Sequence, residues 1–217
     1  MTAAQGFGLG PRPRTRVKIC GVRSVADARF CAEAGADAVG VNFVPSSPRC
    51  VDVDTARAVA TDLGKAILVV GVVAGMSVEA MRALRDATGI GCLQLHGDSP
   101  AADVEALLPH AYAAVSVSTA EDVRRAASLP GDYLLVDTKV AGALGGTGRV
   151  FDWDLVVDLA TRRRLVLAGG LVAANVGKAI EKVRPWCVDT ASGVESAPGV
   201  KDHGKIREFI AAVRAAG

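Results

Sequence analysis

The chain has 217 residues, of which half are hydrophobic and only 4% aromatic, and its 25 basic and 23 acidic residues leave a formal net charge of +2. This balance gives no reason to expect nucleic acid or an anionic membrane as a partner, and no apolar run approaches the roughly 18 residues that span a bilayer. The length is sufficient for one substantial core. With so few aromatic residues, that core must be filled by Val, Leu, Ile and Ala, as in a parallel sheet covered by helices.

The N-terminal segment, residues 1–15, contains Gly, Pro and Arg but lacks the apolar stretch of a signal peptide. We predict a short disordered tail there, followed by one catalytic domain over residues 16–217. The five cysteines are odd in number and form no CxxC pair, which favours reduced thiols and a cytoplasmic location.

Eight short apolar runs follow, and amphipathic helical segments separate them. Most of the runs are nearly continuously apolar, as strands buried on both faces should be. They lie at residues 17–22, 38–43, 66–73, 92–97, 111–117, 133–138, 165–170 and 187–193.

The segments between these runs contain signals for the ends of helices. Ser24 can cap the first helix, Ser99 precedes Pro100 as a cap before a proline at the first helical position, and Thr119 with Asp122 resembles a capping box. Glycines stand where three helices should stop, at residues 35, 64 and 89. A last helix is predicted over residues 203–215.

Regular alternation of strands and helices implies parallel strands joined by right-handed crossovers. Eight such units in about 200 residues predict a single (β/α)8 barrel of the TIM type, at the small end of its size range. The main rival is an open doubly wound sheet, which usually has fewer strands and a GxGxxG fingerprint after its first strand. The first run here is followed by CGVRS, which favours the barrel.

Polar residues and glycines gather at the C-terminal ends of the predicted strands, where barrels of this kind build active sites. The seventh and eighth runs end in small residues, with Gly169 and Gly170 in one turn and Ser192 and Gly193 in the other. Glycine lets backbone N–H groups approach an anion closely, and a helix N-terminus behind the turn favours negative charge. Together the two turns predict a phosphate site.

Cys20 and two aspartates are the candidates for acid–base work. Cys20 precedes Gly21 at the end of the first run, although a lone cysteine is often only a small core residue. Asp137 ends the sixth run, where burial would raise its pKa and suit it to donate a proton. Asp189 lies in the eighth run, and position alone does not decide which aspartate is the acid.

Arg49 ends a loop, Pro45 to Arg49, that contains two prolines, and its guanidinium suits bidentate capture of a carboxylate. The alternative is an exposed, solvated arginine. His96, at the end of the fourth run, is either a supporting hydrogen-bonding residue or a ligand contact. The three scattered histidines and the absence of paired carboxylates offer no metal site of recognisable spacing, so no metal is expected.

Several motifs, taken together and in order, resemble those of the phosphoribosylanthranilate isomerase family. They are KICG (18–21), SPR (47–49), LQLHG (93–97), DT (137–138), GGTG with FDW (145–148 and 151–153), AGGL (168–171) and SGVE with PG-KD (192–195 and 198–202). The match runs from about residue 17 to 209, which is almost the whole domain.

The resemblance implies an Amadori rearrangement of N-(5-phosphoribosyl)anthranilate to the corresponding 1-deoxyribulose 5-phosphate in tryptophan biosynthesis, without a cofactor. It assigns the general base to Cys20 and the general acid to Asp137. It further implies that Arg49 holds the anthranilate carboxylate and that Gln94 and His96 support the floor of the site. The glycine turns, Gly169 with Gly170 and Ser192 with Gly193, would cradle the phosphate.

Two residues depart from the family pattern. Ala191 stands where a second serine often precedes the glycine of strand 8, and Cys50 replaces the aromatic residue common after the loop arginine. Neither touches the proposed acid or base, so we expect activity to survive. The sequence leaves monomer and homodimer open, and the glycine-rich loop 145–148 is a candidate mobile lid.

Two alternatives remain open at this point. Another phosphosugar barrel, such as a ribulose-phosphate epimerase or an indole-glycerol-phosphate enzyme, would share the phosphate turns but would not explain Cys20, Arg49 and Asp137 together. A catalytically idle barrel that binds a phosphorylated metabolite is the alternative from another class.

Overall fold

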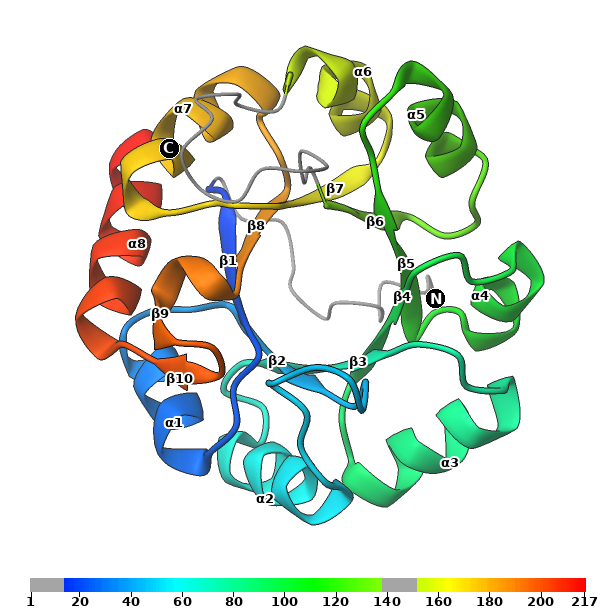
Figure 1. Cartoon of the computed structure of the whole chain (residues 1–217), viewed down its shortest axis with the longest axis vertical. Helices are drawn as coiled ribbons and strands as arrows, with labels where there is room; N and C mark the ends of the chain where they lie inside the picture. Colours follow the sequence, from blue (N-terminus) through cyan, green and yellow to red (C-terminus); the bar gives the residue numbers. More distant parts are fainter. Residues whose placement is uncertain (1–13, 138–151) are drawn as a thin grey trace.

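The computed structural model describes residues 14–137 and 152–217, which form a closed barrel of eight parallel strands in sequence order (Figure 1). This confirms the predicted (β/α)8 barrel. The predicted tail lies mostly, and the candidate lid loop 145–148 entirely, outside the described residues. The strands are β1 (Arg16–Cys20), β2 (Ala38–Asn42), β3 (Leu68–Val73), β4 (Cys92–His96), β5 (Ala111–Ser116), β6 (Tyr133–Asp137), β7 (Arg164–Ala168) and β8 (Cys187–Thr190).

The helices form an outer ring around the strands, and α8 lies between α7 and α1, where it completes this ring (Figure 1). They are α1 (Val25–Glu33), α2 (Val53–Leu63), α3 (Val78–Thr88), α4 (Ala101–Leu107), α5 (Ala120–Ala127), α6 (Asp154–Arg162), α7 (Ala173–Val183) and α8 (His203–Ala216). None of the helices in the described part of the chain is both long and apolar enough to cross a membrane.

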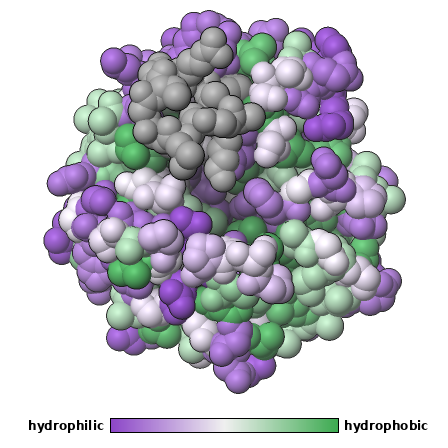
Figure 2. Space-filling view, in the orientation of Figure 1, coloured by the Kyte–Doolittle hydropathy of each residue, from purple (hydrophilic) through white to green (hydrophobic). Residues whose placement is uncertain are grey.

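Pairing between the first and last strands closes the barrel, with Arg16 opposite Cys187 and Ile19 opposite Thr190. Because all eight strands run in the same direction, their C-terminal ends open at one mouth. The strand-end residues that the sequence singled out are therefore brought to the same end of the molecule. Figure 2 shows hydrophilic side chains both around the rim of the molecule and near its centre.

Two layers of apolar side chains stabilise the barrel. The larger layer fills the space between strands and helices and includes Val17, Leu93, Leu134 and Phe209, all buried. The inner layer fills the barrel itself and consists mostly of small or medium-sized residues, for example Ala114. Low aromatic content is therefore matched by a core of branched aliphatic residues, as the composition indicates.

Side-chain caps start several helices where the sequence predicts them. Ser24 accepts a hydrogen bond from the Asp27 backbone N–H at 3.1 Å at the start of α1. Gly64 and Gly89 occupy the C-caps of α2 and α3, and Gly35 follows the C-cap of α1 with a positive φ. The prediction for Ser99 is wrong by one residue: Pro100 takes the N-cap position with an extended ψ, and α4 begins at Ala101.

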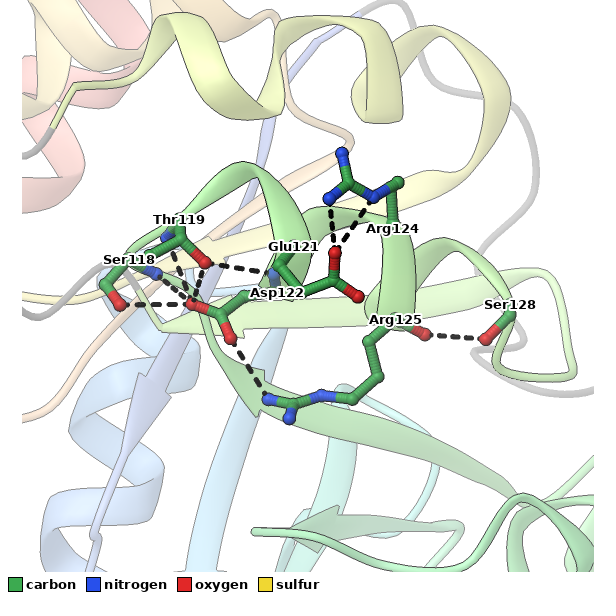
Figure 3. Close-up of polar contacts among 7 residues, drawn as sticks. All are labelled: Ser118, Thr119, Glu121, Asp122, Arg124, Arg125 and Ser128. Atoms are coloured by element: carbon green, nitrogen blue, oxygen red, sulfur yellow. Dashed lines mark hydrogen bonds and ion pairs between the residues drawn. The ribbon is translucent and has the colours of Figure 1, made fainter.

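The predicted capping box of α5 is present, and Figure 3 shows its contacts. Thr119 Oγ1 accepts from the Asp122 backbone N–H at 3.2 Å, and Asp122 Oδ2 accepts from the Thr119 N–H at 3.0 Å. The same carboxylate oxygen accepts from the Ser118 N–H and hydroxyl. These bonds, led by the one from the Ser118 backbone, lower the pKa of Asp122 to about 2.

Replacing Thr119 with Ala is expected to lower the free energy of unfolding by about 1 kcal/mol, because an N–H of the first turn of α5 loses its side-chain acceptor. Denaturant titration followed by circular dichroism measures this change. Ser128→Ala, at the other end of the same helix, is the matched control, since the Ser128 hydroxyl only donates to the Arg125 carbonyl oxygen. Equal effects of the two substitutions would contradict a capping role for Thr119.

The eighth strand is shorter than predicted, and the chain after it folds in a way that the sequence did not predict. β8 ends at Thr190, followed by a 3₁₀ turn (Ser192–Val194) and an antiparallel hairpin of β9 (Glu195–Ala197) and β10 (Val200–Lys201). Gly199 has a φ of +80° in the hairpin turn. The hairpin carries two charged residues back to the barrel mouth.

Candidate active site

A cavity of about 330 Å³ opens at the C-terminal ends of the strands. It brings together eight of the nine site residues that the sequence predicts: Cys20, Arg49, Gln94, His96, Asp137, Gly169, Gly170 and Ser192. The ninth, Gly193, lies next to Ser192 in the 3₁₀ turn but does not line the cavity. Asp189, the alternative acid, lines it as well.

Cys20 is the last residue of β1, and its side chain is buried at the edge of the cavity. Gly40, on the neighbouring strand β2, makes room for it, because a Cβ at Gly40 would lie 2.8 Å from Cys20 Sγ. Burial raises the pKa of the Cys20 thiol, and the nearby positive charge of Lys18 opposes this effect. The thiol is therefore not simply a core side chain.

Asp137 is the last residue of β6 and is partly exposed at the cavity. In the sheet register it lies opposite Ala168 on β7 and Ser116 on β5. Because β1 and β6 are not neighbouring strands, Cys20 and Asp137 approach the cavity from different parts of its wall. A substrate between them could exchange protons with two separate groups.

Asp189 is held in an ion pair that the sequence reading missed. Lys18, on β1, is completely buried, and its ammonium donates to Asp189 Oδ2 at 3.0 Å. The pairing uses adjacent strands, since Lys18 lies opposite Asp189 in the β1–β8 register. Asp189 is therefore placed as a counterion to an ammonium, which favours Asp137 as the proton donor.

Arg49 contacts a carboxylate of the protein itself. Its Nε and Nη2 atoms donate to the two carboxylate oxygens of Glu195, each at 2.7 Å. Glu195 Oε1 also accepts from the buried Lys201 ammonium at 2.9 Å. Two cations around one carboxylate leave a net positive charge at the cavity edge, which suits an anionic ligand group.

The two hydrogen bonds to Glu195 therefore fix the direction of the Arg49 guanidinium. We expect Glu195→Gln to raise KM for a carboxylate-bearing substrate about tenfold and to change kcat much less, because an orienting charge-assisted bond is lost. Steady-state kinetics measures both constants. Glu121→Gln, which breaks an exposed ion pair with Arg124 on α5, is the matched control; a KM unaffected by Glu195→Gln would show that this carboxylate does not orient Arg49.

The turn after β7 contains two glycines with positive φ. Gly169 and Gly170 have φ values of +99° and +64°, a region that favours glycine. They precede α7, and the Val172 N–H at its start is already capped by Asn175 Oδ1 at 2.9 Å. Gly169, Gly170 and Ser192 line the cavity, and backbone N–H groups at turns of this kind suit an anion.

Gly193 holds the two turns close together. A Cβ there would overlap the Leu171 carbonyl oxygen and lie 2.6 Å from Thr190 Oγ1, which itself donates to that carbonyl oxygen at 2.8 Å. This explains why a glycine that does not line the cavity still matters for its shape.

Gly193→Ala is expected to destabilise the fold by about 1–3 kcal/mol, because backbone atoms must move apart, and to raise KM for a phosphorylated substrate about tenfold or more. Thermal unfolding and steady-state kinetics measure the two effects. Gly177→Ala, in α7, is the matched control. Its Cβ would meet Ala216 Cβ of α8 at an ordinary 3.8 Å, so the substitution should slightly stabilise the fold. Similar behaviour of the two variants would contradict the role of Gly193.

Gln94 and His96 lie on β4 but differ in depth. Gln94 is buried, and its Oε1 accepts from the Tyr112 hydroxyl at 2.9 Å inside the barrel. His96 ends the strand and is exposed at the mouth. Both residues line the cavity, with Gln94 deeper in the barrel than His96.

Comparisons with known proteins identify one family. The model of the family described as N-(5'phosphoribosyl)anthranilate (PRA) isomerase matches residues 17–212. A curated relative from Pseudomonas aeruginosa, named N-(5'-phosphoribosyl)anthranilate isomerase, is 44% identical over 205 residues, which cover 93% of this chain and 96% of the relative.

Two solved structures are similar over nearly their whole length. The phosphoribosyl anthranilate isomerase of Thermotoga maritima superposes with a TM-score of 0.87 and 39% identity, covering 93% of this chain and 99% of that one. A second structure, of a phosphoribosyl anthranilate isomerase in complex with reduced 1-(o-carboxyphenylamino)-1-deoxyribulose 5-phosphate, has a TM-score of 0.84, 36% identity and the same coverage. The chain belongs to the N-(5'-phosphoribosyl)anthranilate isomerase family.

Proposed function

We propose that this chain converts N-(5-phosphoribosyl)anthranilate to 1-(2-carboxyphenylamino)-1-deoxyribulose 5-phosphate, with Cys20 as general base and Asp137 as general acid. The observation that carries this proposal is that both side chains line one cavity, from non-adjacent strands, beside two glycine turns. The reaction needs both a proton donor and a proton acceptor, and family membership supports the same assignment.

In this proposal the two anionic ends of the substrate bind to different parts of the cavity wall. The phosphate would lie at the turns of Gly169 and Gly170 and of Ser192 and Gly193. The anthranilate carboxylate would lie near Arg49, on the part of its guanidinium that Glu195 leaves available. Since the two anion sites lie on different loops, they would fix the length and direction of the bound molecule.

Each proton has a donor and an acceptor in the proposed reaction. Asp137 protonates the ribose ring oxygen, and the C1–O bond breaks to leave an iminium at C1. This cation makes the C2 proton acidic, and the Cys20 thiolate removes it to give an enolamine. The enolamine becomes the ketone when C1 gains the proton from Cys20 and the C2 hydroxyl returns one to Asp137, so both residues regain their starting states.

The family resemblance implies no cofactor, and the partner of the chain is a phosphorylated small molecule. Its five cysteines are all free thiols, and they support a reducing compartment such as the cytoplasm.

The test is to mix the wild-type chain with freshly generated phosphoribosylanthranilate and follow the loss of anthranilate fluorescence. We expect turnover, with competitive inhibition by reduced 1-(2-carboxyphenylamino)-1-deoxyribulose 5-phosphate, hereafter the reduced product. Tight binding of substrate without turnover would instead support the idle barrel that sequesters a phosphorylated metabolite. Activity only on ribulose 5-phosphate would favour an epimerase.

A further inference from the structure

Three ionisable side chains lie close together on β1 and β8, beside the cavity: Lys18, Cys20 and Asp189. Lys18 and Cys20 are two residues apart on β1, so both side chains point to the same side of the sheet. The Lys18 ammonium donates to Asp189 Oδ2 at 3.0 Å, and its positive charge acts to lower the pKa of the nearby Cys20 thiol. Lys18 is fully buried and is not among the residues that line the cavity. It therefore acts on a bound substrate only through another group.

The neighbouring strand β2 leaves space for both side chains. A Cβ at Gly40 would lie 2.8 Å from Cys20 Sγ and 3.2 Å from Lys18 Nζ. Both atoms therefore border the volume that any larger residue would fill. A side chain at this position of β2 would push the sulfur and the ammonium away from their present places.

We propose that Lys18 is a positioning residue that supplies the positive charge needed for Cys20 to ionise, an inference that rests on the proposed role of Cys20 as the base. The thiolate, not the thiol, accepts a proton from carbon. A buried thiolate without a nearby cation would be poorly stabilised, because burial disfavours the charged form. An ammonium beside the sulfur offsets part of this penalty before the substrate iminium forms.

The charges around Cys20 agree with a supporting role for Lys18 and a catalytic role for Cys20. Burial raises the pKa of the thiol; Lys18 lowers it, Asp189 raises it, and Lys201 lowers it. For Lys18, burial acts to lower the pKa, but attraction to Asp189 and Cys20 outweighs burial and raises it, so the ammonium persists while the thiol titrates. The other charged or titratable groups that interact with these residues are Arg49 from the loop after β2, Cys92 from β4, Tyr112 from β5 and Cys187 from β8. His96 from β4 and Asp137 from β6 line the same cavity.

Asp189 is the counterion that keeps Lys18 in place while Cys20 is a neutral thiol. Its Oδ2 accepts from Lys18, and its buried Oδ1 has no hydrogen-bond partner among residues 14–137 and 152–217. Its negative charge competes with the thiolate for the same ammonium. Loss of the lysine charge should therefore raise the pKa of the Cys20 thiol, and loss of the aspartate charge should lower it.

The experiment measures the rate at which iodoacetamide alkylates Cys20 from pH 6 to pH 10, with the modified peptide identified by mass spectrometry. A Cys50→Ser background removes the half-buried second thiol, and the remaining three cysteines are buried. Lys18→Met should slow alkylation about tenfold or more at a given pH below the wild-type midpoint, because one pKa unit changes the thiolate fraction tenfold. Asp189→Asn should accelerate it.

If Lys18 and Asp189 only stabilised the fold, their substitutions would not change the alkylation rate of Cys20 in opposite directions. The neutral double variant Lys18→Met with Asp189→Asn avoids an unpaired buried charge, and it should alkylate more slowly than the background protein, because the effect of Lys18 on the thiol pKa exceeds that of Asp189. Lys178→Met, which removes an exposed lysine of α7, is the matched control and should behave as the background protein does. Wild-type alkylation in the double variant, or slower alkylation in Asp189→Asn, would overturn the proposal.

Turnover gives an independent reading of the same variants. Because Lys18 does not line the cavity, Lys18→Met should lower kcat and leave KM nearly unchanged, and its kcat should recover as pH rises. Alkylation needs no turnover, so an inactive wild-type chain would refute the proposed function and still leave the test of Lys18 complete. An unchanged kcat and pH profile in Lys18→Met would refute the role of Lys18 alone.

Discussion

Asp137→Asn is expected to lower kcat about 10²- to 10⁴-fold, the usual contribution of a general acid, with a much smaller change in KM. The amide has nearly the same shape as the carboxyl group but cannot protonate the ribose ring oxygen. Ring opening, the first chemical step, therefore loses its proton donor. Loss of anthranilate fluorescence, measured at saturating substrate, reports kcat directly.

Asp189→Asn is the comparison that decides between the two aspartates. Asp189 accepts a hydrogen bond from the Lys18 ammonium, so its substitution should change the ionisation of Cys20 and the pH dependence of the rate. It should not mimic the loss of an acid. An active Asp137→Asn beside an inactive Asp189→Asn would transfer the role of general acid to Asp189.

Cys20→Ala is expected to lower kcat by a similar factor, about 10²- to 10⁴-fold. The methyl group cannot accept the C2 proton of the iminium intermediate, although the substrate can still bind. Cys20→Ser keeps a hydroxyl of similar size, but a hydroxyl is a far weaker base at neutral pH, so it should recover little activity. The two variants should retain affinity for the reduced product, which a binding titration measures.

A Cys20→Ala variant with wild-type kcat would contradict the assignment of the base. A variant that fails to bind the reduced product would point to a disturbed cavity instead. The comparison with Cys20→Ser separates these cases, because it nearly preserves the volume of the side chain.

The sequence was sufficient to predict the barrel, because the strands carry near-continuous apolar runs and the helices between them carry caps. The first and last residues of the strands were less certain. The run at 187–193 includes residues of the 3₁₀ turn, since small residues such as Ala191 are compatible with either structure. The hairpin of β9 and β10 is too short, with three and two residues, to show an alternating pattern.

For the site, strand-end position predicts which residues meet, but not what each of them touches. Lys18 was missed because a lysine inside an apolar strand gives no signal by itself. Its separation of two residues from Cys20, together with an aspartate on the last strand, was the available clue. Glu195 and Lys201 could not be placed next to Arg49, because their position depends on the unpredicted hairpin.

The most direct measurement compares single-turnover rates on phosphoribosylanthranilate for the wild-type chain and the double variant Cys20→Ala with Asp137→Asn. The wild type should exhaust the fluorescence of the substrate rapidly, and the double variant should follow the uncatalysed decay with the fold intact. Because the two residues act in one proton-transfer sequence, the double loss should be less than the product of the single losses. A double variant that still forms product, or a folded wild type that binds the substrate and never converts it, would contradict acid–base isomerisation by Cys20 and Asp137.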